Sequence, residues 1–170
     1  ALPIYSSLVL LKRCGTVDPT SLVAYVGAGG FTALAKARAM GPDAVIGEVI
    51  ASKLVGRGGA AFPTGRKWDA VRRQPATPHY LVCNADESEP GTFKDRVLLT
   101  QDPFALVEAM TIAAFATGAS KAYLYIRAEY PLAADRMANA IAQTRAAGHF
   151  HGEFDIEIRR GAGAYICGEE

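Results

Sequence analysis

The sequence has few of the residues that most often build metal or redox centres. Only three cysteines occur among the 170 residues, at positions 14, 83 and 167, and no two of them form a C-x-x-C pair. The spacing therefore offers no self-contained iron–sulfur or zinc site. Sparse cysteine without close pairs also favours a reduced, intracellular protein over a disulfide-bonded secreted one.

The chain also has almost no net charge and no long apolar run. Its 18 basic and 17 acidic residues give a formal net charge of +1, which argues against a general electrostatic grip on nucleic acid. The most apolar run, residues 104–119, is interrupted by Glu108 and is too short to span a bilayer. No basic segment followed by an apolar one marks a signal peptide. We therefore expect neither a nucleic-acid partner nor direct membrane insertion.

Apolar residues are abundant enough for a core. They make up 50% of the sequence, and the length suits one ordinary domain, or one domain with an appendage. The chain begins Ala1-Leu2-Pro3, without an initiator Met, and it stops at Gly168-Glu169-Glu170, inside what reads as a loop motif. We expect a fragment of a longer polypeptide.

Proline, glycine and capping signals predict a helical first third, followed by alternating strands and helices. Asp18-Pro19 resembles an N-cap followed by Pro at the first helical position. Gly41-Pro42 ends one helix and starts the next. Helices are predicted over residues 19–26, 31–40, from 42 onward, 65–73, 92–99, 103–117 and 131–147, and strands over residues 79–83, 121–126 and 154–158.

The three predicted strands indicate an α/β fold with a mostly parallel sheet and covering helices, because helices separate them. We interpret residues 79–83 as a buried strand. Residues 154–158 alternate apolar and acidic side chains, as a strand nearer an edge would. Ligands of such sheets lie beyond the carboxyl ends of the strands. Residues 84–91 and 161–170 follow two of the predicted strands there.

Residues 56–68 form the most unusual segment. Four glycines and three cations (Arg57, Arg66 and Lys67) lie within these 13 positions, with Phe62 between them. Glycine lets the backbone approach a ligand closely, and successive N–H groups can form a concave anion site. The cations suit a phosphate, and Phe62 offers a flat face to a heterocyclic ring. The segment therefore has parts for both ends of a nucleotide.

This segment alone leaves two interpretations open. Gly56-x-Gly58-x-x-Ala61 formally matches the dinucleotide fingerprint, but the preceding residues read as helix and Pro63 follows at once. The phosphate-binding pattern G-x-x-x-x-G-K-[ST] does not occur. The glycines support a nucleotide cradle and a plain flexible turn about equally, and the cations with Phe62 favour the cradle.

Residues 84–91 place three carboxylates within four positions, directly after a predicted strand. One interpretation is a solvated acidic turn. The other is a set of acceptors for ring N–H groups or ribose hydroxyls, with Asn84 as both donor and acceptor. The acids could also bind Mg²⁺, which would need a phosphate or further oxygen ligands.

Residues 161–170 (GAGAYICGEE) again suggest backbone laid against a flat ligand, because glycines alternate with small residues before a Tyr and an acidic pair. Cys167 reads as a small buried hydrophobe, and Trp68 as a packing anchor. The three histidines read as one strand residue, His79, and two loop residues.

In this order and spacing, the three motifs resemble the NADH-binding flavoprotein subunit of respiratory complex I. The matching segments are residues 56–68, 81–96 (LVCNADESEPGTFKDR) and 161–170, and residues 18–35 resemble the family's entry region. The motifs are shared by the diaphorase subunits of NAD-linked hydrogenases and formate dehydrogenases. The resemblance implies a Rossmann-like domain that holds FMN, with NADH stacked on the flavin. It divides the chain into a helical segment, residues 1–52, and an FMN/NADH-binding α/β domain, residues 53–170.

The resemblance implies no catalytic side chain, since the flavin carries the chemistry, but it places Glu87 and Glu89 near the reacting centre. The residues that it assigns to FMN are Gly56, Arg57, Gly58, Lys67, Asn84, Asp86, Glu87, Ser88, Gly163, Tyr165, Gly168, Glu169 and Glu170. Those that it assigns to NAD(H) are Gly58, Gly59, Ala60, Phe62, Pro63, Thr64, Gly65, Arg66 and Glu89.

This chain departs from the family pattern in three ways. Ala61 stands where the family usually has Gly, so a methyl could narrow the NADH groove or be harmless. Ala70 lies where some members have an aromatic residue, which removes a second adenine contact. The cysteine cluster E-S-C-G-x-C-x-P-C-R, which binds a [4Fe–4S] centre in the complete subunit, is absent, so we expect no metal site within this chain.

The function implied is hydride transfer from NADH to FMN, followed by transfer of single electrons to iron–sulfur centres of a respiratory NADH:quinone oxidoreductase. Partners would be NADH and other subunits, including iron–sulfur subunits, in the cytoplasm or on the cytoplasmic or matrix face of an energy-transducing membrane. The alternatives are the diaphorase module of an NAD-linked hydrogenase or formate dehydrogenase, and a non-reactive structural fragment. We expect the acidic residues of the site to lower the reduction potential of the flavin.

Overall fold

The fold consists of seven helices and three strands in the described part of the chain. The computed structural model describes residues 9–57 and 60–162. In chain order the elements are α1 (Leu22–Gly27), α2 (Thr32–Met40), α3 (Pro42–Ala51), α4 (Thr64–Arg72), β1 (His79–Ala85), α5 (Lys94–Gln101), α6 (Pro103–Thr117), β2 (Ala119–Ile126), α7 (Pro131–Ala146) and β3 (Asp155–Arg160).

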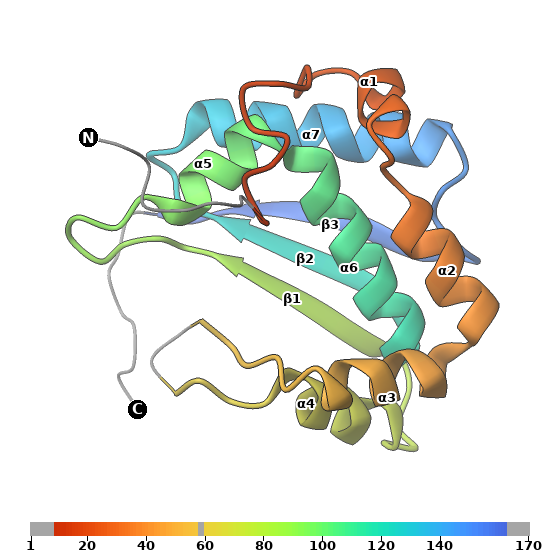
Figure 1. The fold of residues 1–170 in the computed structure, drawn as a ribbon. Helices are drawn as coiled ribbons and strands as arrows, with labels where there is room; N and C mark the ends of the chain where they lie inside the picture. Colours follow the sequence, from red (N-terminus) through yellow and green to blue (C-terminus); the bar gives the residue numbers. More distant parts are fainter. Residues whose placement is uncertain (1–8, 58–59, 163–170) are drawn as a thin grey trace.

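The strands form one parallel sheet in the order β1-β2-β3. Cys83 pairs with Leu124, and Leu124 pairs with Ile158. Helices α5 and α6 make the crossover from β1 to β2, and α7 makes the crossover from β2 to β3 (Figure 1). The expected α/β class with a parallel sheet and covering helices is confirmed, and β3 lies at an edge of this sheet as its alternating sequence predicts.

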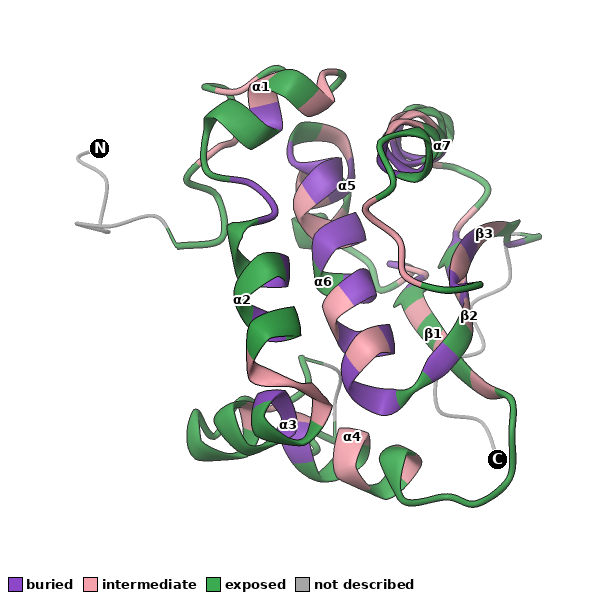
Figure 2. Cartoon of the chain, turned by 90° about the vertical axis from the view of Figure 1, so that its right-hand side faces the viewer, coloured by how far each residue is buried: buried purple, intermediate pink, exposed green. Residues whose placement is uncertain are grey.

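The core lies between the sheet and two long helices. Helices α6 and α7 lie on one side of the sheet, and their buried residues face it and each other (Figure 2). Leu124 and Ile126 of β2 are completely buried, as are Val107 of α6 and Met137 of α7. Each such side chain contributes about 1.5–3 kcal/mol by leaving water, so this layer stabilises the fold.

The prediction that residues 79–83 form a buried strand is wrong. Strand β1 alternates between half-buried and exposed residues until its buried last residue, and Tyr80 and Val82 are 55% and 66% exposed. The reason is that β1 is an edge strand and, among the described residues, helices cover only one face of the sheet. An apolar run of five residues does not distinguish this arrangement from a fully buried strand.

The N-terminal helices form a second layer around α6. Helices α2, α3 and α4 all pack against it, and Ala37, Val45 and Ile46 form a small core with Ala116. Trp68 of α4 packs against that core, which confirms the prediction that it is a packing anchor. The division of the chain at residue 52 stays a prediction.

Helix α1 begins later than predicted. Ser21 is its N-cap, and the Ser21 side chain accepts a hydrogen bond from the Ala24 N–H. The Asp18 carboxylate instead accepts hydrogen bonds from the backbone and hydroxyl of Thr20. Both Asp and Ser favour N-caps, so the residue type alone does not distinguish the two positions.

The end of α6 was predicted correctly. Gly118 follows Thr117 with φ at 74°, the left-handed conformation that glycine adopts without strain. No single helix in the described ranges is both long and apolar enough to cross a membrane. Helices α5 and α6 meet these criteria only as a pair, which is bent by 98° at its junction.

Candidate functional site

The acidic loop after β1 folds back on itself. Asn84 is an exposed residue near the end of β1, and its side-chain oxygen accepts a hydrogen bond from the Asp86 N–H at 2.9 Å. The Ser88 hydroxyl donates to the Asp86 carboxylate, also at 2.9 Å. These contacts hold a tight polar turn at the carboxyl end of the strand, the place where parallel sheets bind ligands.

Glu87 points away from that turn, into the protein. It is only 4% exposed, and its carboxylate accepts hydrogen bonds from the backbone N–H groups of Asp95 at 2.8 Å and Arg96 at 3.1 Å. These residues form the first turn of α5, whose own N-cap residue, Phe93, makes no side-chain cap. Glu87 therefore caps α5 from the β1 loop, because a carboxylate satisfies the unpaired N–H groups of a helix start.

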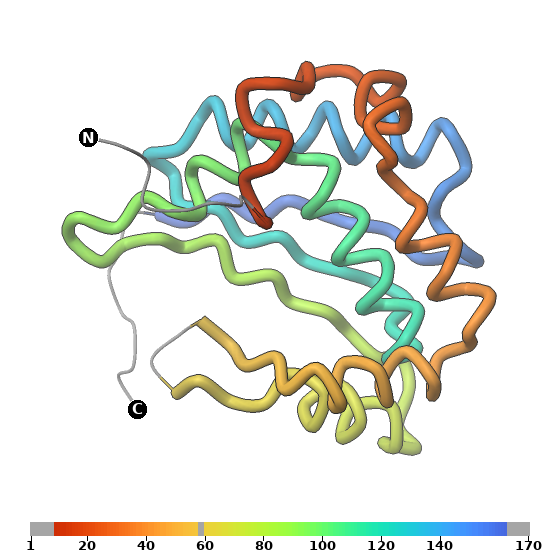
Figure 3. Tube along the Cα trace, in the orientation of Figure 1, coloured from red at the N-terminus to blue at the C-terminus, as the bar shows by residue number. Residues whose placement is uncertain are grey.

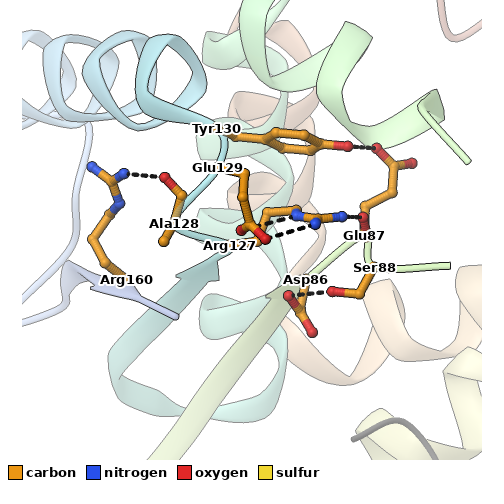
Figure 4. A network of polar contacts seen from close by, with 8 residues as sticks. All are labelled: Asp86, Glu87, Ser88, Arg127, Ala128, Glu129, Tyr130 and Arg160. Atoms are coloured by element: carbon orange, nitrogen blue, oxygen red, sulfur yellow. Dashed lines mark hydrogen bonds and ion pairs between the residues drawn. The ribbon is translucent and has the colours of Figure 1, made fainter. Parts of the chain in front are cut away.

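The loop after β2 holds Glu87 in place from the other side. The Tyr130 hydroxyl donates to the Glu87 carboxylate at 3.1 Å, and the Arg127 guanidinium donates to the Glu87 carbonyl oxygen (Figure 4). The loops at the carboxyl ends of β1 and β2 are thus joined through one residue.

Arg127 is itself fixed by Glu129. Two of its guanidinium nitrogens donate to the two carboxylate oxygens of Glu129, at 3.2 and 2.8 Å. The guanidinium hydrogen bonds lower the pKa of Glu129 to about 2, so the pair stays ionised at neutral pH. Arg160, at the end of β3, donates to the Ala128 carbonyl oxygen and ties the third strand to the same loop (Figure 4).

The Tyr130 ring lies against two cations. The guanidinium carbon of Arg127 is 5.1 Å from the ring centroid and that of Arg96 is 5.7 Å away, which are cation–π distances. Burial first, and then the neighbouring Glu87 carboxylate, raise the pKa of Tyr130, so its hydroxyl remains a donor.

Sequence reasoning missed residues 127–130. The signal was available, because Arg127-Ala128-Glu129-Tyr130 follows a predicted strand as directly as the acidic loop follows β1. The segment carries two charged side chains and a tyrosine at the carboxyl end of the central strand.

The glycine-rich segment forms a hairpin-like loop between α3 and α4. Val55 and Pro63 form an antiparallel bridge, and the Gly56 N–H donates to the Phe62 carbonyl at 2.9 Å. The loop runs alongside β1 toward the end where β1 and β2 finish (Figures 1 and 3). A helix precedes it, as predicted, so the segment is not the strand–turn–helix of a dinucleotide fingerprint.

Ala61 occupies a strained position in this loop. Its φ is 45°, in the left-handed region that glycine adopts freely and alanine avoids. From the sequence, its methyl group was expected either to narrow the NADH groove or to be harmless. The structure adds a third, which is backbone strain.

A groove of about 500 Å³ lies beside Phe62. Lys67, Ala70, Val71 and Gln74 of α4 line it together with Phe62, whose ring is 54% exposed. The small side chain of Ala70 leaves this groove open, where a larger ring would fill part of it.

The three cations of the glycine-rich segment are all exposed. None of them pairs with a carboxylate within the described part of the chain. Unpaired cations around a glycine-rich turn are suited to an anionic ligand.

Two of the glycines have close packing roles. A Cβ on Gly65 would lie 2.5 Å from the Ile50 side chain and 2.7 Å from its backbone nitrogen, so only glycine lets α4 start this close to α3. A Cβ on Gly161 would lie 2.7 Å from the Tyr125 hydroxyl, so the chain after β3 passes directly over that ring. Gly65, predicted to contact NAD(H), is buried.

The structure describes only some of the predicted site residues. Asn84, at the end of β1, lies together with Asp86, Glu87, Ser88 and Glu89, which follow the strand. The described residues of 56–67 lie in or beside the hairpin-like loop and at the start of α4. Cys167 and the predicted ligand residues Gly58, Gly59, Gly163, Tyr165, Gly168, Glu169 and Glu170 lie outside the described residues.

The described residues fit an FMN molecule in their chemistry. Its phosphate needs cations or N–H groups, which the glycine-rich loop offers. Its ring needs hydrogen-bonding groups and flat contacts, which the turn around Asn84 and the exposed Phe62 offer. The assignment of individual residues to FMN or NAD(H) stays a prediction.

Comparisons with known proteins identify the family. The family model of the Nuo51 FMN-binding domain matches residues 49–170. An NADH-quinone oxidoreductase subunit from Aquifex aeolicus is 48% identical over 95% of this chain, and the NADP-reducing hydrogenase subunit HndC of Solidesulfovibrio fructosivorans is 46% identical over 95%. The chain spans 39% and 34% of the lengths of these two relatives.

Solved structures agree with this assignment. A chain of an NAD⁺-reducing [NiFe]-hydrogenase in the air-oxidised state superposes with a TM-score of 0.75 and 41% identity. That match covers 96% of this chain and 26% of the hydrogenase chain. FMN is the cofactor that the family resemblance of the three motifs implied, and the matching family model is that of an FMN-binding domain. The chain therefore belongs to the Nuo51 FMN-binding domain family.

Proposed function

We propose that this chain is the flavin-binding part of an NADH dehydrogenase, which transfers a hydride from NADH to FMN and passes single electrons to iron–sulfur centres of a respiratory NADH:quinone oxidoreductase. The observation that carries the proposal is the arrangement at one end of the parallel sheet. Two polar loops are joined there by hydrogen bonds. The glycine-rich loop, which carries Arg57, extends toward the same end, and Arg66 and Lys67 follow it at the start of α4 (Figure 1).

FMN, when bound, supplies hydride acceptance and one-electron release, and the protein supplies binding and orientation. In this proposal Arg57 and Lys67 hold the phosphate with the N–H groups of the glycine-rich loop. Asn84, Asp86 and Ser88 face the ring. No side-chain nucleophile is required, because the chemistry is carried by the cofactor.

NADH would enter from the groove beside α4. Phe62 presents an exposed ring there, which suits stacking on an adenine. Glu89, exposed after the β1 turn, would meet the ribose nearer the nicotinamide. Holding the nicotinamide and flavin rings at one end of the sheet orients the hydride donor and acceptor. This orientation is the main contribution that a protein makes to hydride transfer.

The diaphorase module of an NAD-linked hydrogenase is the second candidate. It is favoured by the match to the hydrogenase chain and by the HndC relative. Both candidates require iron–sulfur partner subunits to accept electrons. The subunits that co-purify with the protein distinguish them.

The first experiment is to purify the protein and measure its flavin. Heat-released flavin identified as FMN, together with reduction of a dye that depends on NADH, is the expected result. Protein without FMN would contradict the proposal and support a non-reactive structural fragment. Protein with FMN but without NADH-dependent reduction would contradict the NADH role alone.

Replacing Phe62 by alanine tests the place of NADH. We expect the dissociation constant for NADH to rise about tenfold, the order of one lost aromatic stacking contact, while that for FMN changes less than twofold. Tyr80→Ala is the control, because Tyr80 is similarly exposed but lies at the amino end of β1. Equal weakening of FMN and NADH in Phe62→Ala would argue against stacking.

A further inference from the structure

The loop after β2 is hydrogen-bonded to the acidic loop after β1 at one residue, Glu87. Glu87 is held twice by this loop, at its carboxylate by the Tyr130 hydroxyl and at its carbonyl oxygen by the Arg127 guanidinium (Figure 4). A residue held at both its side chain and its main chain cannot rotate or shift without breaking one contact.

The two holding residues are themselves restrained. Arg127 is clamped by both carboxylate oxygens of Glu129, and a bidentate pair fixes the plane of the guanidinium. The guanidinium groups of Arg127 and Arg96 both lie within cation–π distance of the Tyr130 ring. Contacts within the protein therefore hold both donors in place, as a precise site requires.

Glu87 stands between two residues of the proposed flavin site. The Ser88 hydroxyl donates a hydrogen bond to the Asp86 carboxylate. A shift of the Glu87 backbone would therefore move both residues. The Glu87 carboxylate is already occupied by two N–H groups of α5 and one hydroxyl, and it is directed toward α5. The residue thus acts on the site through the backbone it anchors and through its charge.

We propose, on the basis of the proposed function, that Arg127 and Tyr130 are positioning residues of the FMN site, which act through Glu87 to place residues 86–88. Neither was assigned by the sequence motifs. Their contacts connect the carboxyl ends of the neighbouring strands β1 and β2, and so hold the turn after β1 in a fixed position.

The test compares two tyrosines in the purified holoprotein. Tyr130→Phe removes only the hydroxyl that donates to Glu87. Tyr25→Phe is the matched control, because the Tyr25 hydroxyl donates to another buried glutamate, Glu108, at 2.5 Å. The dissociation constant for FMN is measured by titrating the deflavinated protein, and the melting temperature and the flavin midpoint potential are measured in parallel.

Both variants should lose a similar amount of thermal stability, because each loses one hydrogen bond to a buried carboxylate. Only Tyr130→Phe should weaken FMN binding, by about three- to tenfold, the range for one ordinary intramolecular hydrogen bond. Its flavin midpoint should also fall, because the negative charge of Glu87 is then less compensated. Arg127→Lys should weaken FMN at least as much, since lysine keeps the charge but lacks the planar fork.

Unchanged FMN affinity and midpoint in Tyr130→Phe would overturn the inference while leaving the proposed function standing. Equal weakening of FMN by Tyr25→Phe would also overturn it, because the effect would then be one of global stability. If Tyr130→Phe does not fold, Arg127→Lys carries the test by the same two measurements. An unmutated protein that binds no FMN would defeat both proposals.

Discussion

Glu87 and Glu108 are two buried carboxylates with almost the same set of partners in different parts of the molecule. They are 4% and 6% exposed. Each accepts two backbone N–H groups and one tyrosine hydroxyl. The donors are Asp95, Arg96 and Tyr130 for Glu87, and Phe31, Leu34 and Tyr25 for Glu108.

Both carboxylates replace a missing local cap. The N-cap residues of α2 and α5 are Phe31 and Phe93, and neither makes a side-chain cap. A distant glutamate satisfies the N–H groups at the start of each helix and places a negative charge where the helix dipole favours it. An arginine also lies over each tyrosine ring, 5.0 Å from the centroid for Arg13 and Tyr25.

The two glutamates differ in what lies beside them. Glu108 is in the middle of α6, inside the helical layer, and its partners come from α1, α2 and the turn between them. Glu87 follows the carboxyl end of β1, and its neighbours in sequence, Asp86 and Ser88, are polar and half-buried. The same capping arrangement therefore joins helices in one place and anchors a candidate ligand site in the other.

The largest expected effect is on stability at Glu108. Glu108→Ala leaves the Tyr25 hydroxyl and two backbone N–H groups buried without an acceptor, so we expect a loss of about 3 kcal/mol in the free energy of unfolding, at about 1 kcal/mol for each. Urea denaturation measures it. The dissociation constant for FMN should change less than twofold, and a large change would break the contrast with Glu87.

Glu87→Gln should act on the flavin as well as on the fold. Removing a negative charge near the site favours the reduced cofactor, so we expect the FMN midpoint to rise by about 30 mV, which is about 1.4 kcal/mol for a two-electron couple. Redox titration measures this. Glu108→Gln is the matched control, with no expected change. A midpoint that is unchanged or lower in Glu87→Gln would contradict the role of this charge.

The smallest effect concerns the surroundings of Glu108. The His149 ring stacks on Phe31 at 4.0 Å. Burial first, and then Arg38, lower the pKa of His149, while Glu108 acts in the opposite direction. Below the ordinary histidine pKa of about 6.5, the unfolded chain binds more protons than the folded one, so stability should fall as the pH falls.

His149→Phe keeps the stacked ring and removes the titrating group. We therefore expect its melting temperature to fall less than that of the unmutated protein between pH 7.5 and pH 5.5. An equal fall in both proteins would show that His149 does not contribute to acid sensitivity. FMN affinity should be the same in both proteins at each pH, since this region lies outside the candidate site.

Local sequence signals predicted most elements and the class of fold. Gly118 and Gly41 ended helices where expected, and Pro103 and Pro131 began them, because these residues act through their own backbone conformations. The exposed side of β1 was missed, because the burial of a short apolar strand depends on which layers cover it. Asp18 was predicted as the cap of α1 where Ser21 is the cap, because Asp and Ser both suit the position.

The candidate site was predictable in its parts and not in its connections. The glycine-rich and acidic segments stand out by composition, and their resemblance to a family supplied the cofactor. Arg127 and Tyr130 went unnoticed because their role depends on a residue 40 or more positions away. Glu87 was predicted to line the flavin, and the structure shows its carboxylate bonded to α5.

The sequence by itself determined the order of helices and strands and the segments rich in glycine and carboxylates, because periodicity, capping and turn preferences act over a few residues. Only the tertiary structure decided that one glutamate joins helices while the other anchors a loop, since their donors lie 74 to 83 residues away for Glu108 and 8 to 43 residues away for Glu87. A buried charge is stable only beside the donors that packing brings to it, and packing is a property of the whole chain.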